Sequence, residues 1–175
     1  MNKRVKQVIA ALTAHITHED RRFIAQHLDP AQAALFWQMN VPDQRHALNV
    51  AYTALKLAAD EHRIDRDLLI RCALLHDVGK VKGDVSTADK IMTVILDKFA
   101  PHWARQWGRK GRGGKLANFR HAVYIYYNHA ARGAAMLQAI GAGAKMVGIV
   151  AGHHEAPAAG EPPELGIIRR ADSLN

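Results

Sequence analysis

A histidine and an aspartate stand side by side where an apolar stretch of the chain ends. In "CALLHDVGK", from Cys72 to Lys80, the run of apolar residues stops at His76 and Asp77. A carboxylate buried beside leucines costs several kcal/mol unless a partner compensates its charge. Asp77 is also expected at the C-terminal end of a helix, where the macrodipole disfavours negative charge by up to about 1 kcal/mol. A bound cation would offset both penalties, so this pair is a candidate metal site.

Other polar side chains are expected on the apolar faces of separate helices. They are His46, His153 and Asp172. Each of them, like His76, stands four residues from an apolar residue of its own predicted helix, so it lies on the face of that helix that is expected to be buried. A single inward histidine is usually a hydrogen-bonded core residue. Four inward polar groups on different helices instead favour a shared ion. Imidazole and carboxylate together suit Fe, Mn, Zn, Co or Ni better than Ca or Mg.

The elements that position these residues are predicted to be helices throughout. Apolar residues recur every three or four positions instead of alternating, and clusters typical of strands are scarce. The expected fold class is all-α, a single compact multi-helix bundle over residues 1–175, with 1–40 as an N-terminal helical extension.

Capping residues define the expected helix boundaries. The predicted N-caps are Asp29 before Pro30, Asp43, Asp65, Ser86 or Asp84, and Asn128. The predicted ends lie near Asp60, Gly79, Pro101 and Gly141.

A basic stretch interrupts this helical pattern at residues 105–120. "RQWGRKGRGGKLANFR" contains six basic residues, four glycines and no acid, which predicts a mobile loop. One interpretation is a lid that closes over a phosphorylated substrate through Arg109, Lys110 and Arg112. Another is a nucleic-acid-binding module, in which neighbouring aromatic residues stack on bases. The third is a solvated loop with no partner.

The composition of the chain indicates its kind of partner and its cellular location. A formal net charge of +8 favours an anionic partner, and the single cysteine, Cys72, excludes an internal disulfide and is expected to fill the core. The start of the chain turns polar too soon for a secretory signal, and no apolar run is long enough to span a bilayer. We expect a cytoplasmic protein with no membrane partner.

The order of the polar residues resembles the HD-domain superfamily of metal-dependent phosphohydrolases. "RHALNVAYTALKLA" precedes "LLHDVGK", and "ADSLN" follows much later, so the resemblance covers residues 43–175. The matching positions, in chain order, are His46, His76, Asp77, Gly79, Lys80, His129, His153, His154 and Asp172.

This resemblance implies a centre with two divalent transition-metal ions. In the family, one ion is held by the positions of His46, His76, Asp77 and Asp172. His129 and His153 match the ligands of the second ion, with Asp77 as the bridge, and His154 matches a ligand or an outer group. Lys80 matches a lysine that faces the substrate phosphate, although a cation is also favourable at a helix C-terminus.

Departures from the family pattern reduce the range of candidate substrates. No Gly-Tyr-Pro signature follows the paired histidines, and Pro42 replaces a carboxylate four residues before His46, so cyclic dinucleotides are disfavoured. The long insertion between Val81 and Tyr127 also matches poorly the compact relatives that hydrolyse dinucleoside polyphosphates.

The expected function is hydrolysis of a phosphoester or phosphoanhydride in a small nucleotide-like substrate. A hydroxide that bridges the two ions would attack phosphorus, and Lys80 would neutralise the charge that builds on the phosphoryl oxygens. The alternatives are a nucleic-acid-binding module and an HD domain that senses a ligand without turnover. A sensor has no need to keep every metal position, which favours the enzyme.

Overall fold

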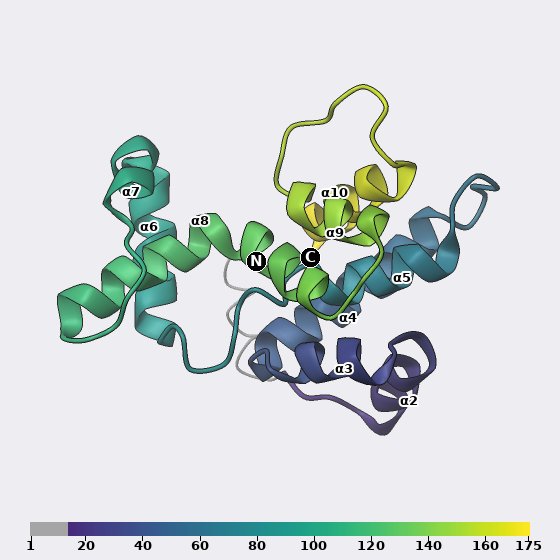
Figure 1. Cartoon of the computed structure of the whole chain (residues 1–175), viewed down its shortest axis with the longest axis horizontal. Coiled ribbons are helices and arrows are strands. Elements are labelled where there is room, and N and C mark those ends of the chain that lie inside the picture. Colours follow the sequence, from purple (N-terminus) through teal and green to yellow (C-terminus); the bar gives the residue numbers. More distant parts are fainter. Residues whose placement is uncertain (1–13) are drawn as a thin grey trace, which may run out of the picture.

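The computed structural model describes residues 14–175, which form helices joined by turns (Figure 1). In chain order the helices are α2 His18–His27, α3 Pro30–Trp37, α4 Val41–Leu57, α5 Arg66–Leu75, α6 Thr87–Phe99, α7 Pro101–Trp107, α8 Lys115–Ala139, α9 Ala144–Gly152 and α10 Pro163–Leu174. Within these residues there is no β-strand, and an isolated antiparallel bridge joins Met39 to Val81. The all-α prediction is confirmed.

The core is built around α5. Seven of its ten residues are buried, and the exceptions are the charged residues Arg66, Asp67 and Arg71. Helices α2, α3, α4, α9 and α10 pack around it. Cys72 is fully buried among them, which confirms its predicted place in the core.

Several predicted caps are present. The side chains of Asp29, Asp65 and Ser86 each accept a hydrogen bond from the backbone N–H three residues ahead, at 2.8, 2.9 and 3.1 Å. Each such cap typically stabilises its helix by about 1 kcal/mol. Gly141 adopts a φ of 78° just after α8, the left-handed conformation that ends helices.

Other predicted boundaries are wrong. Helix α4 begins at Val41 instead of Asp43, because Pro42 fits the first turn of a helix, and it ends at Leu57 instead of Asp60. Helix α8 runs without interruption through Asn128, which does not cap a new helix. Its amide instead donates a hydrogen bond to the Tyr124 carbonyl one turn earlier, at 2.9 Å.

The predicted loop over 105–120 is wrong at both ends. Helix α7 continues to Trp107 and α8 begins at Lys115, which leaves a connection of residues 108–114. The Trp107 ring stacks on Trp103, with centroids 5.1 Å apart, and meets the edge of Phe119 at 5.3 Å. The packing of these rings stabilises helical structure that the glycines and charges alone do not predict.

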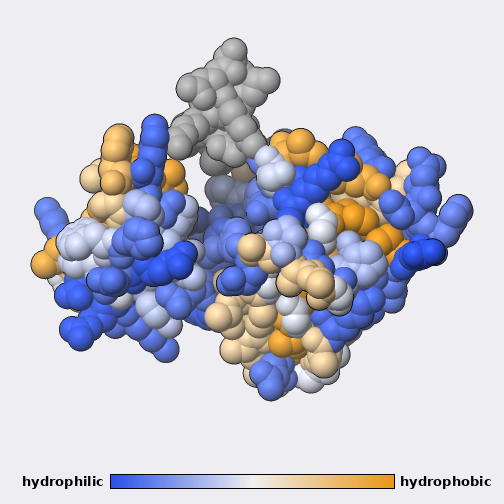
Figure 2. All heavy atoms as spheres, turned by 90° about the horizontal axis from the view of Figure 1, so that it is seen from above, coloured by the Kyte–Doolittle hydropathy of each residue, from blue (hydrophilic) through white to orange (hydrophobic). Residues whose placement is uncertain are grey.

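Helix α8 joins two parts of the molecule (Figure 1). Its first half packs with α6 and α7 in a lobe apart from the core, and its second half packs on α9. Figure 2 shows apolar and strongly hydrophilic surface side by side on this lobe. The exposed apolar residues of α6 are Ile91, Met92, Val94, Ile95 and Phe99.

Helices α2 and α3 account for the described part of the predicted N-terminal extension, and residues 1–13 lie outside the described residues. Across residues 14–175, no helix combines the length and the apolar character needed to cross a bilayer.

Candidate metal centre

Seven side chains that the sequence analysis singled out come together near the ends of α5 and α9. Their ligand atoms form two groups, and within each group they lie within 4.8 Å of one another. The first group is His46 from α4, His76 after α5 and Asp172 from α10. The second is Asp77 after α5, His129 from α8, and His153 and His154 after α9.

Asp77 lies between the two groups. Its Oδ2 atom is 3.5 Å from His76 Nε2 and 4.0 Å from His46 Nε2. Its Oδ1 atom is 3.2 Å from His129 Nε2 and 4.0 Å from His153 Nε2. One carboxylate oxygen therefore faces each group, which is the arrangement that a bridging ligand requires.

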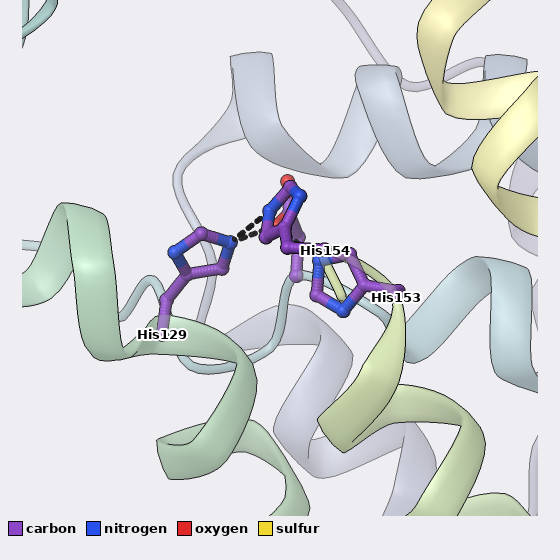
Figure 3. A group of neighbouring side chains, drawn as sticks. His129, His153 and His154 are labelled. Carbon is purple, nitrogen blue, oxygen red and sulfur yellow. Dashed lines mark hydrogen bonds and ion pairs between the residues drawn. The ribbon is translucent and has the colours of Figure 1, made fainter. Parts of the chain in front are cut away.

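Short contacts tie distant elements together at the centre. His46 Nε2 and Asp172 Oδ1 are 2.9 Å apart and link α4 to α10. His129 Nε2 and His154 Nε2 are also 2.9 Å apart, and Figure 3 shows these two rings facing each other with His153 beside them.

Backbone hydrogen bonds fix the orientation of three imidazoles. Nδ1 of His76, His129 and His153 lies 2.8, 2.8 and 2.7 Å from the carbonyl oxygen three residues earlier. Because a carbonyl only accepts, Nδ1 carries the hydrogen, and Nε2 of the neutral ring keeps its lone pair. Such bonds typically orient histidines for a metal ion.

Buried acceptors in the centre lack partners. His76 Nε2, His153 Nε2 and Asp77 Oδ1 are buried and have no hydrogen-bond partner among residues 14–175. All three atoms are acceptors, so they cannot satisfy one another, and an unpaired buried polar group is costly. A cation would satisfy them together, so the residues present fit a metal ion.

The comparison with known families agrees with this geometry. The HD-domain family model matches residues 44–175, most of the chain. The chain belongs to the HD-domain family. Neither a curated protein nor a solved structure gave a significant match. All seven residues of the cluster lie within the part of this HD domain that the family model matches, residues 44–175.

Lys80 contacts the buried aspartate of the HD motif, the adjacent pair His76 and Asp77. Its Nζ lies 2.7 Å from Asp77 Oδ2. Burial by itself raises the pKa of Asp77, but Lys80, His76 and His129 outweigh it and hold that pKa well below its usual value. Asp77 is therefore a carboxylate at neutral pH.

Burial lowers the pKa of three histidines of the centre, His76, His153 and His154, and so keeps them neutral. It lowers the pKa of His153 to about 3, and the pKa of buried His76 falls in the same direction. Burial, with a contribution from His129, lowers the pKa of His154 to about 4. Neutral imidazole is the form that binds metal ions.

Acidification is expected to destabilise the metal-free protein between pH 6.5 and pH 4. The pKa of His153 is about 3 in the folded protein and about 6.5 in an unfolded chain. Between these values the unfolded state binds a proton that the folded state does not. The free energy of unfolding then falls by roughly 1.4 kcal/mol per pH unit for each such histidine. Denaturant unfolding of the parent and of His153→Gln at pH 7 and pH 5 measures this, and an equal loss in both proteins would contradict it.

Gly79 lets the HD motif approach α8. It was predicted to end α5, but α5 ends at Leu75, and Gly79 is not among the glycines with left-handed φ in the described chain. A Cβ at Gly79 would lie 2.0 Å from the His129 carbonyl oxygen and 2.9 Å from the Gly133 nitrogen. Only glycine fits, because the two backbones are in contact there.

The basic residues are not brought into the centre. Arg109, Lys110 and Arg112 line a hollow at the start of α8. Lys110 and Arg112 also line a second hollow that extends along α8 to Arg132 and Asp84. In this structure the predicted lid residues therefore line hollows along α8 and are not members of the seven-residue cluster.

A pocket beside Lys80 was not predicted from the sequence. Thr93 of α6 and Asn40 before α4 line it, and neither was a candidate site residue. The available signal was a threonine within the apolar run from Ile91 to Leu96, where a polar side chain needs a partner.

Proposed function

We propose that this HD domain is a hydrolase that uses two divalent transition-metal ions to cleave a phosphoester or phosphoanhydride in a small nucleotide-like substrate. The main support is Asp77, which is buried and directs one oxygen toward each group of ligand atoms. The two groups supply imidazole and carboxylate ligands, the donor set that suits Fe, Mn, Zn, Co or Ni.

The chain's own residues would hold the ions and orient the ligand atoms toward them. When bound, two such ions lower the pKa of a shared water toward neutrality and polarise a phosphoryl oxygen. Asp77 supplies negative charge to both positions, and the backbone bonds of His76, His129 and His153 fix the directions of their Nε2 lone pairs.

Lys80 reaches the centre from its solvent-facing edge. Its side chain is 27% exposed, whereas that of Asp77 is 3% exposed. A substrate phosphate that approaches from solvent would therefore meet the Lys80 ammonium beside the metal ligands. There the lysine neutralises the charge that develops on the phosphoryl oxygens.

Two observations weigh against the alternative functions. The rings of Trp107 and Phe119 pack against each other, and the Arg120 guanidinium lies 5.5 Å from the Trp107 ring centroid, so these rings offer a poor platform for bases. The complete set of ligand positions is also unnecessary in a sensor without turnover. Both observations favour the enzyme.

Neutralising the basic connection is expected to weaken substrate binding. A triple variant, Arg109→Gln, Lys110→Gln and Arg112→Gln, removes donors suited to phosphate, and the Michaelis constant should rise while metal content stays unchanged. Kinetics and elemental analysis measure these effects. Tight, salt-sensitive binding of single-stranded RNA by the parent, lost in the triple variant with unchanged kinetics, would identify a nucleic-acid contact instead.

A panel of phosphate esters tests the proposed function. Protein loaded separately with each candidate metal should hydrolyse at least one nucleotide, lose activity with a chelator and regain it on reloading. Absence of hydrolysis by protein with full metal content, across nucleoside mono-, di- and triphosphates, dinucleotides and sugar phosphates, would contradict the proposal.

A further inference from the structure

A pocket of about 190 Å³ adjoins the metal centre at Lys80. It lies between the core and the lobe of α6 and α8, and the turn after the HD motif forms part of its wall. Its apolar wall consists of Val81, Val85, Val94, Ala122 and Ile125. The volume is below the roughly 300–1,000 Å³ of sites that enclose a whole ligand, so the pocket suits one part of a ligand.

The charged residues of the pocket are already paired. Lys80 Nζ is 2.7 Å from Asp77, and Lys90 Nζ is 2.7 Å from Asp43. The remaining charged residue of the wall, Asp84, pairs with Arg132. An ionised group placed here would have to compete with these pairs, so the pocket favours an uncharged ligand group.

A buried hydroxyl in the wall lacks a partner. Thr93 is 2% exposed, and its Oγ1 has no hydrogen-bond partner in the described part of the chain. A buried polar atom without a partner is costly, so it favours a ligand that supplies one. Asn40, on the α4 side of the pocket, precedes the helix without a side-chain capping bond, and its amide is a second uncharged polar group.

We infer that this pocket binds the uncharged organic group of the phosphorylated substrate, while the phosphate lies toward the metal centre beyond Lys80. The class it fits is a compact ring with apolar faces and a hydrogen-bonding edge, as in a nucleobase. Thr93 and Ala122 then determine substrate specificity. The Thr93 hydroxyl forms a hydrogen bond with the polar edge of the ring, and the small side chain of Ala122 leaves room for the ring. This inference rests on the proposed hydrolase function.

Filling the pocket should change which esters are cleaved. In Ala122→Phe, kcat/KM for nucleoside monophosphates should fall at least about tenfold, while methyl phosphate, which leaves the pocket empty, should change little. Ala135→Phe, at an exposed position on the same helix, is the matched control and should match the parent. Thr93→Val, which keeps the shape and removes the hydroxyl, should raise KM for nucleotides by about tenfold with a smaller effect on kcat.

A binding measurement separates the pocket from the catalytic proposal. Uncharged nucleosides, followed by ligand-observed NMR, should bind the parent and Ala135→Phe and fail to bind folded Ala122→Phe. If the parent hydrolyses no ester, the proposed function fails, and nucleoside binding still decides the role of the pocket. Absence of binding by every nucleoside, or an unchanged substrate preference in Ala122→Phe and Thr93→Val, would overturn the inference.

Discussion

Asp77→Asn is expected to lower the rate of hydrolysis by several orders of magnitude while the helices stay intact. The substitution removes the charge that faces both groups of ligand atoms. It also replaces one acceptor oxygen with an amide nitrogen that donates, beside imidazole nitrogens that are themselves acceptors. Loss of a ligand shared by two ions should weaken both sites together.

The measurement is the rate at saturating metal, with circular dichroism as the check on folding. Asp67→Asn is the matched control, because it makes the same chemical change on α5 at a side chain that is 60% exposed. Asp67→Asn should keep the parent rate. Activity of Asp77→Asn within a few-fold of the parent would show that Asp77 is a structural residue at the end of its helix.

Gly79→Ala is expected to destabilise the protein by about 3 kcal/mol or more. The new methyl group would meet the backbone of α8 at His129, which no change of side-chain rotamer can relieve. The HD motif and α8 must separate to admit it, so the affinity for metal should fall together with the free energy of unfolding.

Gly148→Ala provides the control for this substitution. Gly148 lies within α9, and a Cβ there would have no neighbouring atom within 4 Å. Replacing this glycine should stabilise the helix by about 0.5–1 kcal/mol. Denaturant unfolding of both variants measures the difference. Equal stability of the two would contradict the close approach of the backbones.

Much of the fold and the membership of the cluster followed from helical periodicity. The spacing of His76 from Cys72 and of Asp172 from Ile168 places each on the inner side of its helix, and both residues lie in the cluster. Caps such as Asp65 were predictable because they act within one turn. His129 was not predicted by helical spacing, because only the family resemblance singled it out.

The features that sequence reasoning missed depend on contacts between distant segments. Gly79 is required by the backbone of α8, some fifty residues later, and not by a local turn. Helix α7 and the start of α8 lie where glycines and charges predicted a loop, because Trp103, Trp107 and Phe119 pack together there. Local propensity is a weak guide where tertiary packing overrides it.

The pocket beside Lys80 was missed for the same reason. The sequence marks Thr93 only as a threonine within an apolar run, and a hydroxyl in such a place often bonds the backbone of its own helix. Its lack of a partner, and the pairing of every charged residue around it, become visible only when α4, α6 and α8 are assembled.

The metal content of the protein tests the two-ion centre most directly. Protein purified without chelator, stripped and reloaded with each candidate transition metal should be analysed for bound ions per chain. Two facing groups of ligands around Asp77 predict about two ions per chain. About one ion would leave only the site of His46, His76, Asp77 and Asp172, and fewer than about half an ion per chain after reloading would contradict a metal centre.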